Sequence, residues 1–374
     1  MANGKSYMDN ESEIKLVIAE FNDSSKPGLE GLLKRTVIAP AFYNLAFLEA
    51  YAATSHHKIV LAQLVDSSGL ILAILPGKEK SGNRFENITF RGWDHLDVIS
   101  TRSDYSQLLI TLICKKYRVL SLMSFQEEAR YENSPNRAFT TEGFKCPYME
   151  LPSEFELLLN SLSSSFKKTV RRKLNKFFKD GGEIIVVDSD ASENEQMQSF
   201  EELWDLHSRR AEDSGKTSRF TNEDIKKFHI NVSRHASKNE GVTVLFFKAI
   251  LNGRVIGVYY CFKTSNAIYY FNSGIDPEFS LYSPGMVLMA TSIEWAINQS
   301  LTTFDFLRGT ESYKFHWTDK VKLNKNYYFA STPFPRFKAF PAYFKDQRNR
   351  IGAKKVILGM FSDGSKSAVK SGNV

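Results

Sequence analysis

The sequence predicts an α/β (α+β) protein of two domains, each a mixed, mainly antiparallel sheet flanked by helices. Its 374 residues are too many for one ordinary compact domain and suit two, each large enough to bury its own core. Hydrophobic residues make up 42% and charged residues 24% of the chain, which is typical of a globular protein rather than a disordered one. Both halves share a rough helix-plus-sheet plan, which indicates a doubled domain without a sequence repeat between the halves.

The first domain, expected over residues 1–155, begins with a helix and a hairpin. Apolar residues recur at helical spacing from Pro40 to Ala53. Two strand-like runs, 59–66 and 70–77, are joined by an Asp-Ser-Ser-Gly turn. The remaining elements expected in this domain are a strand over 86–93, a helix over 104–116, a strand over 117–125 and a closing strand near 144–151.

The second domain, expected over residues 156–334, opens with a basic helix that the serines 163–165 can cap. Its apolar stripe is Phe166, Val170, Leu174 and Phe177. Its basic residues are Lys167, Lys168, Arg171, Arg172, Lys173, Lys176 and Lys179. A strand over 183–187 and helices over 195–212 and 222–237 are expected next.

Three strands, a loop, a helix and a strand then follow in this order. Strands over 242–250 and 254–262 flank Leu251-Asn-Gly253, which is a strong hairpin signal, and a third strand covers 267–273. The loop GIDPEFSLYSP leads to a helix over 285–298, with Pro284 just ahead of it. A buried strand, TTFDF, ends the run.

The start of the helix at 285 is a candidate anion site. A loop that passes directly into a helix points backbone N–H groups and the positive end of the helix dipole at its ligand, which suits a pyrophosphate. Gly285 lets the backbone approach closely, and Ser283 can add a hydroxyl donor. The same Ser-Pro-Gly sequence can also simply start a helix. The residues of this site are Tyr282, Ser283, Pro284, Gly285 and Met286.

The run from Tyr282 to Trp317, with its segments DFLRG (305–309) and ESYK (311–314), resembles one branch of the GNAT superfamily. That branch is the CelD-like acetyltransferases of cellulose and exopolysaccharide biosynthesis, which are similar to the FemAB-type peptidoglycan aminoacyltransferases. The similarity begins at the basic helix and extends more faintly through the first domain. It implies two tandem GNAT-like domains that bind acetyl-CoA or another acyl-CoA between splayed strands, with the pyrophosphate at residues 283–286.

The resemblance departs from the typical pattern at one point. Typical GNAT enzymes carry a longer loop with a leading Gln or Arg and two small residues, whereas this chain has Ser-Pro-Gly-Met. Aminoacyl-tRNA, which FemAB-like enzymes use on this fold, therefore stays an alternative donor. The basic helix also allows two interpretations: a positive face toward CoA phosphates, tRNA or an acidic glycan, or a solvated face that covers the apolar stripe.

The segment after the last strand supplies the candidate catalytic residues. Direct attack of an amine on a thioester needs a base, an oxyanion stabiliser and often an acid, but no covalent nucleophile. Glu311 is the preferred base and Tyr313 the candidate acid, while Lys314 or Arg308 would stabilise charge or bind phosphate. Asp305 is a further catalytic candidate, and an Asp305–Arg308 ion pair that only holds the loop is an equal alternative.

A helix face with Trp204, His207 and Arg210 could wall the acceptor site, and Trp317 is a further candidate for binding substrate. The helix triple also fits an ordinary packing pattern. The seven His residues lack the paired spacing of a metal site, so we expect no metal. The three cysteines, Cys114, Cys146 and Cys261, are expected to be buried and reduced.

The net charge of +7 lies in a basic, aromatic C-terminal tail, residues 335–374, where nine Lys and Arg oppose two Asp. Because the rest of the chain is near neutral, nucleic acid is not an expected partner, except tRNA under the FemAB-like alternative. The tail would suit an anionic membrane or dock on its own protein. A membrane span and a signal peptide are not expected, which predicts a cytoplasmic location, with peripheral contact at the inner face of the membrane.

The leading hypothesis is a cytoplasmic N-acyltransferase that uses acyl-CoA. Among such enzymes, an N-acetyltransferase is the favoured interpretation. By resemblance, its acceptor is an amino sugar or another envelope or exopolysaccharide precursor. One alternative is FemAB-like aminoacyl transfer from tRNA to a peptidoglycan precursor. Another is a catalytically silent GNAT-fold module that binds a partner in polysaccharide synthesis.

Overall fold

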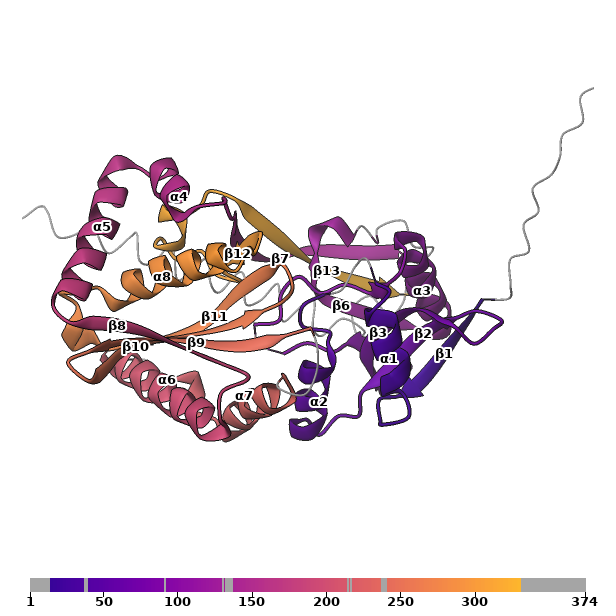
Figure 1. The fold of residues 1–374 in the computed structure, drawn as a ribbon. Helices are drawn as coiled ribbons and strands as arrows, with labels where there is room; N and C mark the ends of the chain where they lie inside the picture. Colours follow the sequence, from indigo (N-terminus) through magenta and orange to yellow (C-terminus); the bar gives the residue numbers. More distant parts are fainter. Residues whose placement is uncertain are drawn as a thin grey trace, which may run out of the picture.

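A computed structural model describes residues 14–36, 40–90, 92–129, 131, 137–213, 215, 217–236 and 241–330. The expected tail from residue 335 lies outside these ranges. Within them, thirteen strands form one continuous sheet with helices on its faces (Figure 1). Neighbouring strands in this part of the chain are antiparallel except for the pairs β4–β6 and β11–β12. The predicted fold class, mixed and mainly antiparallel sheet with flanking helices, is therefore confirmed.

The first half contains the predicted helix and hairpin, together with three elements that were not predicted, β1, α1 and β5. Its elements are β1 (Lys15–Glu20), α1 (Lys26–Leu33), α2 (Leu45–Thr54), β2 (Val60–Val65), β3 (Ile71–Lys80), β4 (Arg84–Asn87), β5 (Ile99–Ser100), α3 (Ser103–Lys116), β6 (Val119–Gln126) and β7 (Arg137–Glu150). In the hairpin turn, Asp66 accepts hydrogen bonds from the backbone N–H groups of Ser68 and Leu70. The turn chemistry read from the sequence thus operates as expected.

The predicted strand over 86–93 is wrong beyond Asn87, where β4 ends. Ile88 and Trp93 are fully buried, so their apolar character reflects core packing of an irregular segment rather than strand pairing. Gly92 has a φ of +92°, a conformation that L side chains rarely adopt. Hydrophobicity alone does not separate a buried loop from a strand.

The second half follows the predicted order, with α4 and β13 as additions. Its elements are α4 (Phe155–Ser161), α5 (Ser164–Lys179), β8 (Gly182–Asp188), α6 (Glu193–Asp213), α7 (Glu223–Ala236), β9 (Thr243–Leu251), β10 (Arg254–Lys263), β11 (Ala267–Ile275), α8 (Pro284–Asn298), β12 (Thr303–Asp305) and β13 (Val321–Ala330). Ser163 caps α5 by accepting the N–H of Phe166. Asn252 and Gly253 both have positive φ, as a tight hairpin turn requires.

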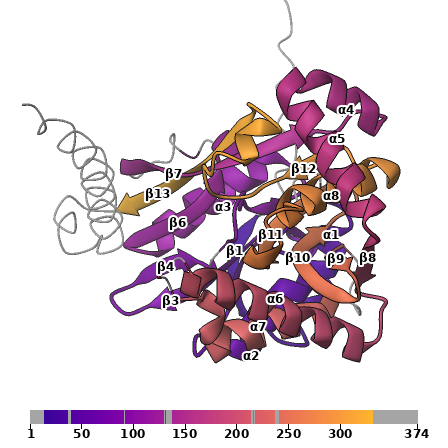
Figure 2. The ribbon, with the colours of Figure 1, turned by 90° about the vertical axis from the view of Figure 1, so that its left-hand side faces the viewer.

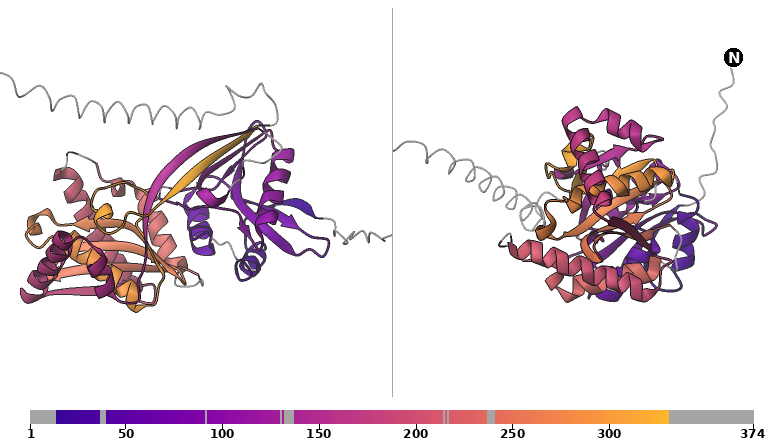
Figure 3. Two further views of the ribbon diagram at one scale, coloured as in Figure 1. Left: turned by 90° about the horizontal axis from the view of Figure 1, so that it is seen from above. Right: turned by 60° about the vertical axis from the view of Figure 1, so that its left-hand side comes forward.

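Two long strands join the halves (Figure 3). β7 pairs with β13 along most of its length and with β12 at Tyr148–Glu150. β13 comes late in the chain, yet it lies between β6 and β7 beside the strands of the first half. The sheet therefore runs without a break from one half to the other, and the domain boundary expected at 155/156 stays a prediction.

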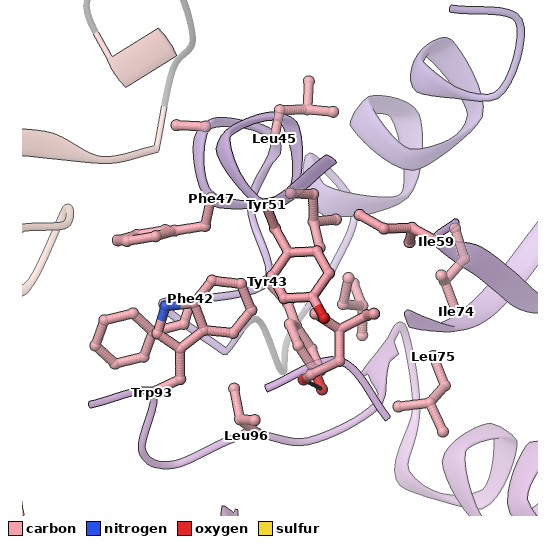
Figure 4. Close-up of a cluster of buried hydrophobic side chains, with 14 of the residues drawn as sticks. Phe42, Tyr43, Leu45, Phe47, Tyr51, Ile59, Ile74, Leu75, Trp93 and Leu96 are labelled. Carbon is pink, nitrogen blue, oxygen red and sulfur yellow. Dashed lines mark hydrogen bonds between the residues drawn. The ribbon is translucent and has the colours of Figure 1, made fainter. Parts of the chain in front are cut away.

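Helices cover both faces of the strands β8 to β11 (Figure 2). α5 and α8 lie on one face and α6 and α7 on the other. The core on the α6–α7 face continues into the first half, where Phe47 of α2 meets Phe262 of β10 with ring centroids 4.9 Å apart. Figure 4 shows Phe47 with the aromatic and aliphatic side chains of this shared core, including Trp93. Burial of this apolar surface fixes the two halves against each other.

The three cysteines are free and buried, as predicted. Burial raises the pKa of the Cys146 and Cys261 thiols far above their ordinary value, so both are protonated and poor nucleophiles at neutral pH.

Candidate active site

β11 and β12 are parallel neighbours that separate after three residue pairs, from Ala267↔Thr303 to Tyr269↔Asp305. β11 continues to Ile275, whereas the chain after Asp305 turns toward β7, where the Phe306 N–H donates to Pro147 O at 3.0 Å. The edge of β11 beyond Tyr269 is therefore not paired with β12. The register of β11 against β10 also shifts between Tyr260 and Cys261, as in a β-bulge.

A cavity of about 980 Å³ opens where the two strands part. Residues from both halves line it: Gly92 comes from the first half, and the others come from α5, α6, β10, β11, α8, the loops after α6 and β11, and the segment after β12. The lining residues that the sequence singled out are His207, Arg210, Gly285, Met286, Arg308, Glu311, Tyr313, Lys314 and Trp317. The structure thus brings most of the predicted site residues to one place.

The start of α8 reaches the cavity through Gly285 and Met286. The Tyr259 hydroxyl donates to the Gly285 carbonyl at 2.6 Å and holds this first turn in place. Ser283, with a φ of +53°, donates its hydroxyl to Ser280 O and does not cap the helix. Tyr282 donates to Asp180, and neither these two residues nor Pro284 is among the residues that line the cavity.

The basic helix α5 borders both the cavity and the loop before α8. At one end, Phe166 lines the cavity and stacks on His316 with ring centroids 4.9 Å apart. Farther along, Lys173 donates to Leu281 O at 2.7 Å, and the Lys176 ammonium lies 4.8 Å from the centre of the Tyr282 ring. This face of α5 thus places positive charge beside the start of α8.

Glu311, Tyr313 and Lys314 form a compact group on the cavity wall. The Lys314 side chain is only 3% exposed, and its ammonium contacts a Glu311 oxygen at 3.0 Å and donates to Arg308 O at 3.0 Å. Although Tyr313 is 37% exposed, desolvation by the surrounding protein, together with the neighbouring Tyr270 hydroxyl and Glu311 carboxylate, raises the pKa of Tyr313 above its ordinary value. Tyr313 is therefore protonated at neutral pH.

The sequence did not point to the tyrosines of β10 and β11 that complete this wall. Tyr259 and Tyr270 have ring centroids 4.6 Å apart, and the Tyr270 hydroxyl donates to Ser273 at 2.8 Å. Next to them lies Asn272, whose buried amide nitrogen has no hydrogen-bond partner among the residues that the structure describes. The paired tyrosines of each strand were visible in the sequence, but the bulge that decides which of them faces the cavity was not.

Asp305 and Arg308 do not pair with each other, which corrects the ion pair considered as an alternative. Arg308 forms its ion pair with Asp94 at 2.8 Å, and its guanidinium also lies over the Phe144 ring. Asp305 is fully buried and is not among the residues that line the cavity. Its carboxylate forms an ion pair with His95, with 3.1 Å between Oδ2 and the ring nitrogen Nε2, but the two groups are not aligned for a hydrogen bond. Both partners come from the first half.

The expected acceptor wall is only partly assembled. His207 lines the cavity, with Nδ1 2.8 Å from the Ser218 hydroxyl, and Trp317 lines it as well. Trp204 lies outside the lining, where it stacks on Phe200 and carries the Lys226 ammonium over its ring. Its half-buried position against the core thus fits the packing pattern considered as the alternative.

Within the described ranges, groups of three or more His, Cys, Asp or Glu side chains placed to hold a metal ion are absent. In the same part of the chain, helices with the length and apolar character of a bilayer span are also absent.

Residues 164–315 match the family model of the acetyltransferase (GNAT) domain. This segment is a GNAT domain. It contains β11, α8 and β12, and so the two strands whose separation opens the cavity. The match confirms the predicted superfamily, while the CelD-like branch stays a prediction. The search of curated proteins found no match to the chain.

Solved structures resemble the GNAT domain together with the first half. FemX is 11% identical with a TM-score of 0.58, covering 87% of this chain and 99% of that chain. L-PGS from Bacillus licheniformis is 14% identical with a TM-score of 0.54, covering 85% and 95%. The C-terminal domain of a putative lysylphosphatidylglycerol synthetase from Agrobacterium fabrum is 10% identical with a TM-score of 0.50, covering 80% and 91%. These likenesses concern the fold alone.

Proposed function

We propose that the protein is an acyl-CoA-dependent N-acyltransferase, with acetyl-CoA as the preferred donor. The observation that carries this proposal is the separation of β11 from β12 beside the start of α8, which opens the 980 Å³ cavity. An extended chain with amide groups, such as the thioester arm of CoA, can bond to the open edge of β11 as a strand would. Its phosphates would then reach Gly285, Met286 and the positive end of α8.

In the proposed reaction, the acceptor amine attacks the carbonyl carbon of the thioester. A C–N bond forms, the C–S bond breaks, and the amine proton passes to the Glu311 carboxylate. Tyr313, which holds its proton at neutral pH, donates that proton to the departing thiolate. Lys314, 3.0 Å from Glu311, keeps the carboxylate beside the cavity. The geometry supports this assignment, because all three side chains line the same wall.

The acceptor class is proposed from the CelD-like resemblance: an amino sugar or another envelope or exopolysaccharide precursor. Polar groups on the cavity wall, among them His207, Asn272 and Ser273, are suited to hydroxyl-rich acceptors. We also propose that the reaction takes place in the cytoplasm, with peripheral membrane contact through the basic tail.

Substitution at Gly285 tests donor binding. A Cβ atom there would have Tyr259 Oη as its nearest neighbour at 3.7 Å, which is ordinary van der Waals contact, so that Gly285→Ala should keep the fold. Gly285→Trp must place its ring in the cavity. We expect calorimetry to show saturable acetyl-CoA binding by the wild type and by Gly285→Ala, and loss of binding in Gly285→Trp. Absence of binding by the wild type would refute the proposed donor.

FemAB-like transfer from aminoacyl-tRNA is a second candidate, supported by the likeness to FemX over both halves and by the basic face of α5 near α8. Binding of charged tRNA without binding of acetyl-CoA would favour it. A catalytically silent module is the third candidate. It would be favoured if the protein bound neither donor and formed a stable complex with a partner.

A further inference from the structure

The first half of the chain holds the loop that leads to Glu311. Asp94, which is fully buried, accepts hydrogen bonds from the backbone N–H and Nε of Arg308, each at 3.1 Å, and its carboxylate lies 2.8 Å from the second Arg308 nitrogen, Nη2. The Trp93 carbonyl accepts a further bond from Arg308 at 2.9 Å. Asn324 of β13 donates its amide to Asp94 at 2.7 Å. Both the backbone and the side chain of Arg308 are thus fixed by residues from outside the GNAT domain match.

Arg308 in turn holds the group on the cavity wall. Its carbonyl accepts the hydrogen bond of the buried Lys314 ammonium at 3.0 Å, and the same ammonium contacts Glu311 at 3.0 Å. A continuous series of polar contacts therefore leads from Asp94 through Arg308 and Lys314 to Glu311. We call these four residues the Asp94 relay.

The backbone between these contacts needs such support. Leu307 has a φ of +52° and Gly309 a φ of +119°, both in the region that L side chains rarely adopt. A conformation of this kind persists where the surrounding structure fixes it, and it is concentrated at functional sites. The bonds from Asp94 to Arg308 lie directly between the two positions.

Charge makes the relay sensitive to the loss of one member. Asp94 and Lys314 are both buried, and each is compensated by its neighbours in the relay. Removal of the Asp94 charge leaves the Arg308 guanidinium without its counter-charge, and the local structure then rearranges. Because Lys314 connects directly to Glu311, that rearrangement would reach the cavity wall.

We infer that Asp94 is a positioning residue that sets the place of the Glu311 carboxylate through Arg308 and Lys314. This inference rests on the proposed function, in which Glu311 is the base. It adds that the first half of the chain is part of the catalytic machinery, although Gly92 is the only one of its described residues that lines the cavity. A misplacement of about 1 Å can cost on the order of a hundredfold in rate.

Asp94→Asn tests the inference, and Asp97→Asn is its matched control. Asp97 lies in the same segment and is also buried, but it accepts hydrogen bonds from the Val98 N–H, Gln126 and Tyr131 rather than from the relay. With acetyl-CoA and glucosamine as probe substrates, Asp94→Asn should lower kcat about tenfold to a hundredfold. Its KM for acetyl-CoA should stay within about twofold of the wild type, because the donor site is unchanged.

Two results would overturn the inference: a kcat for Asp94→Asn equal to that of the wild type, or an equal loss in both variants. If Asp94→Asn does not fold, Asn324→Ala leaves the Asp94 carboxylate in place but removes the amide that donates to it and that accepts from the His95 N–H. This variant should also lower kcat, and an unchanged kcat would count against the relay. Amide hydrogen exchange separates this inference from the proposed function. Should the wild type not turn over acetyl-CoA, faster exchange of residues 306–316 in Asp94→Asn alone would still support the relay, and equal exchange in both variants would refute it.

Discussion

Replacement of Glu311 by Gln is the most direct test of the proposed mechanism. Glutamine keeps the size of the side chain and an oxygen that can accept from Lys314, but it cannot take a proton from the acceptor amine. Loss of a general base lowers turnover by about 10²- to 10⁴-fold, equivalent to roughly 3–5 kcal/mol of activation free energy. We expect kcat to fall by that factor.

The effect on stability should be much smaller. The Glu311 side chain is 55% exposed, so solvent screens its ion pair with Lys314, and the glutamine oxygen replaces a charged acceptor by a neutral one. We estimate a loss of about 1 kcal/mol in the free energy of unfolding, or a few degrees in Tm. The structure thus separates a large catalytic effect from a small structural one.

The assay follows thiol release from acetyl-CoA at saturating donor, together with thermal unfolding of each variant. Glu150→Gln is the matched control, because Glu150 is also an exposed glutamate in an ion pair, with Lys320 at 2.7 Å, and it does not line the cavity. Turnover of Glu311→Gln at the wild-type rate would remove Glu311 from the mechanism. A loss of turnover that is matched by Glu150→Gln would attribute the effect to surface charge instead.

Three further predictions concern the surroundings of the site. Gly309→Ala should cost about 1–3 kcal/mol in urea unfolding and lower kcat, because the φ of +119° disfavours alanine and its Cβ would lie 2.4 Å from Glu311 Oε2; wild-type values for both would contradict it. Burial opposes the charge on His95, but the Asp305 carboxylate outweighs it and raises the His95 pKa above 6.5. The wild type should therefore exceed His95→Gln in free energy of unfolding by its full amount below pH 6.5, and this difference should decline as pH rises through the folded-state pKa of His95. A difference that is constant from about pH 5 to about pH 9 would refute this. Phe47→Ala should destabilise the protein by about 3–5 kcal/mol in urea unfolding, and a loss below about 1 kcal/mol would show that the shared core contributes little.

The prediction of the fold from the sequence succeeded where the signal lies in neighbouring residues. The hairpin at Asn252-Gly253 and the α5 cap at Ser163 depend on turn and capping chemistry within a few positions, and both were expected. The strand predicted over 86–93 failed, because buried apolar side chains in an irregular segment resemble a strand when only periodicity is considered. β13 was not predicted, because its partners β6 and β7 are distant in the sequence.

The residues of the candidate site were likewise predicted only in part. Gly285, Glu311 and Tyr313 were identified from one continuous segment and lie together on the cavity wall. Tyr259, Tyr270 and Asn272 were missed, because strand alternation without the bulge does not say which side chains face the cavity. Whether the identified residues act as proposed is left to the kinetic tests described above.

By itself, the sequence determined the order of elements, the hairpin turns and the segment in which the chemistry was sought, because each depends on local periodicity and on the backbone preferences of nearby residues. Only the tertiary structure decided that β7 and β13 link the halves and that Arg308 pairs with Asp94, 214 positions away, rather than with Asp305. The physical reason is that both candidate partners of Arg308 are carboxylates. The choice between them depends on which one the folded sheet brings within hydrogen-bonding distance.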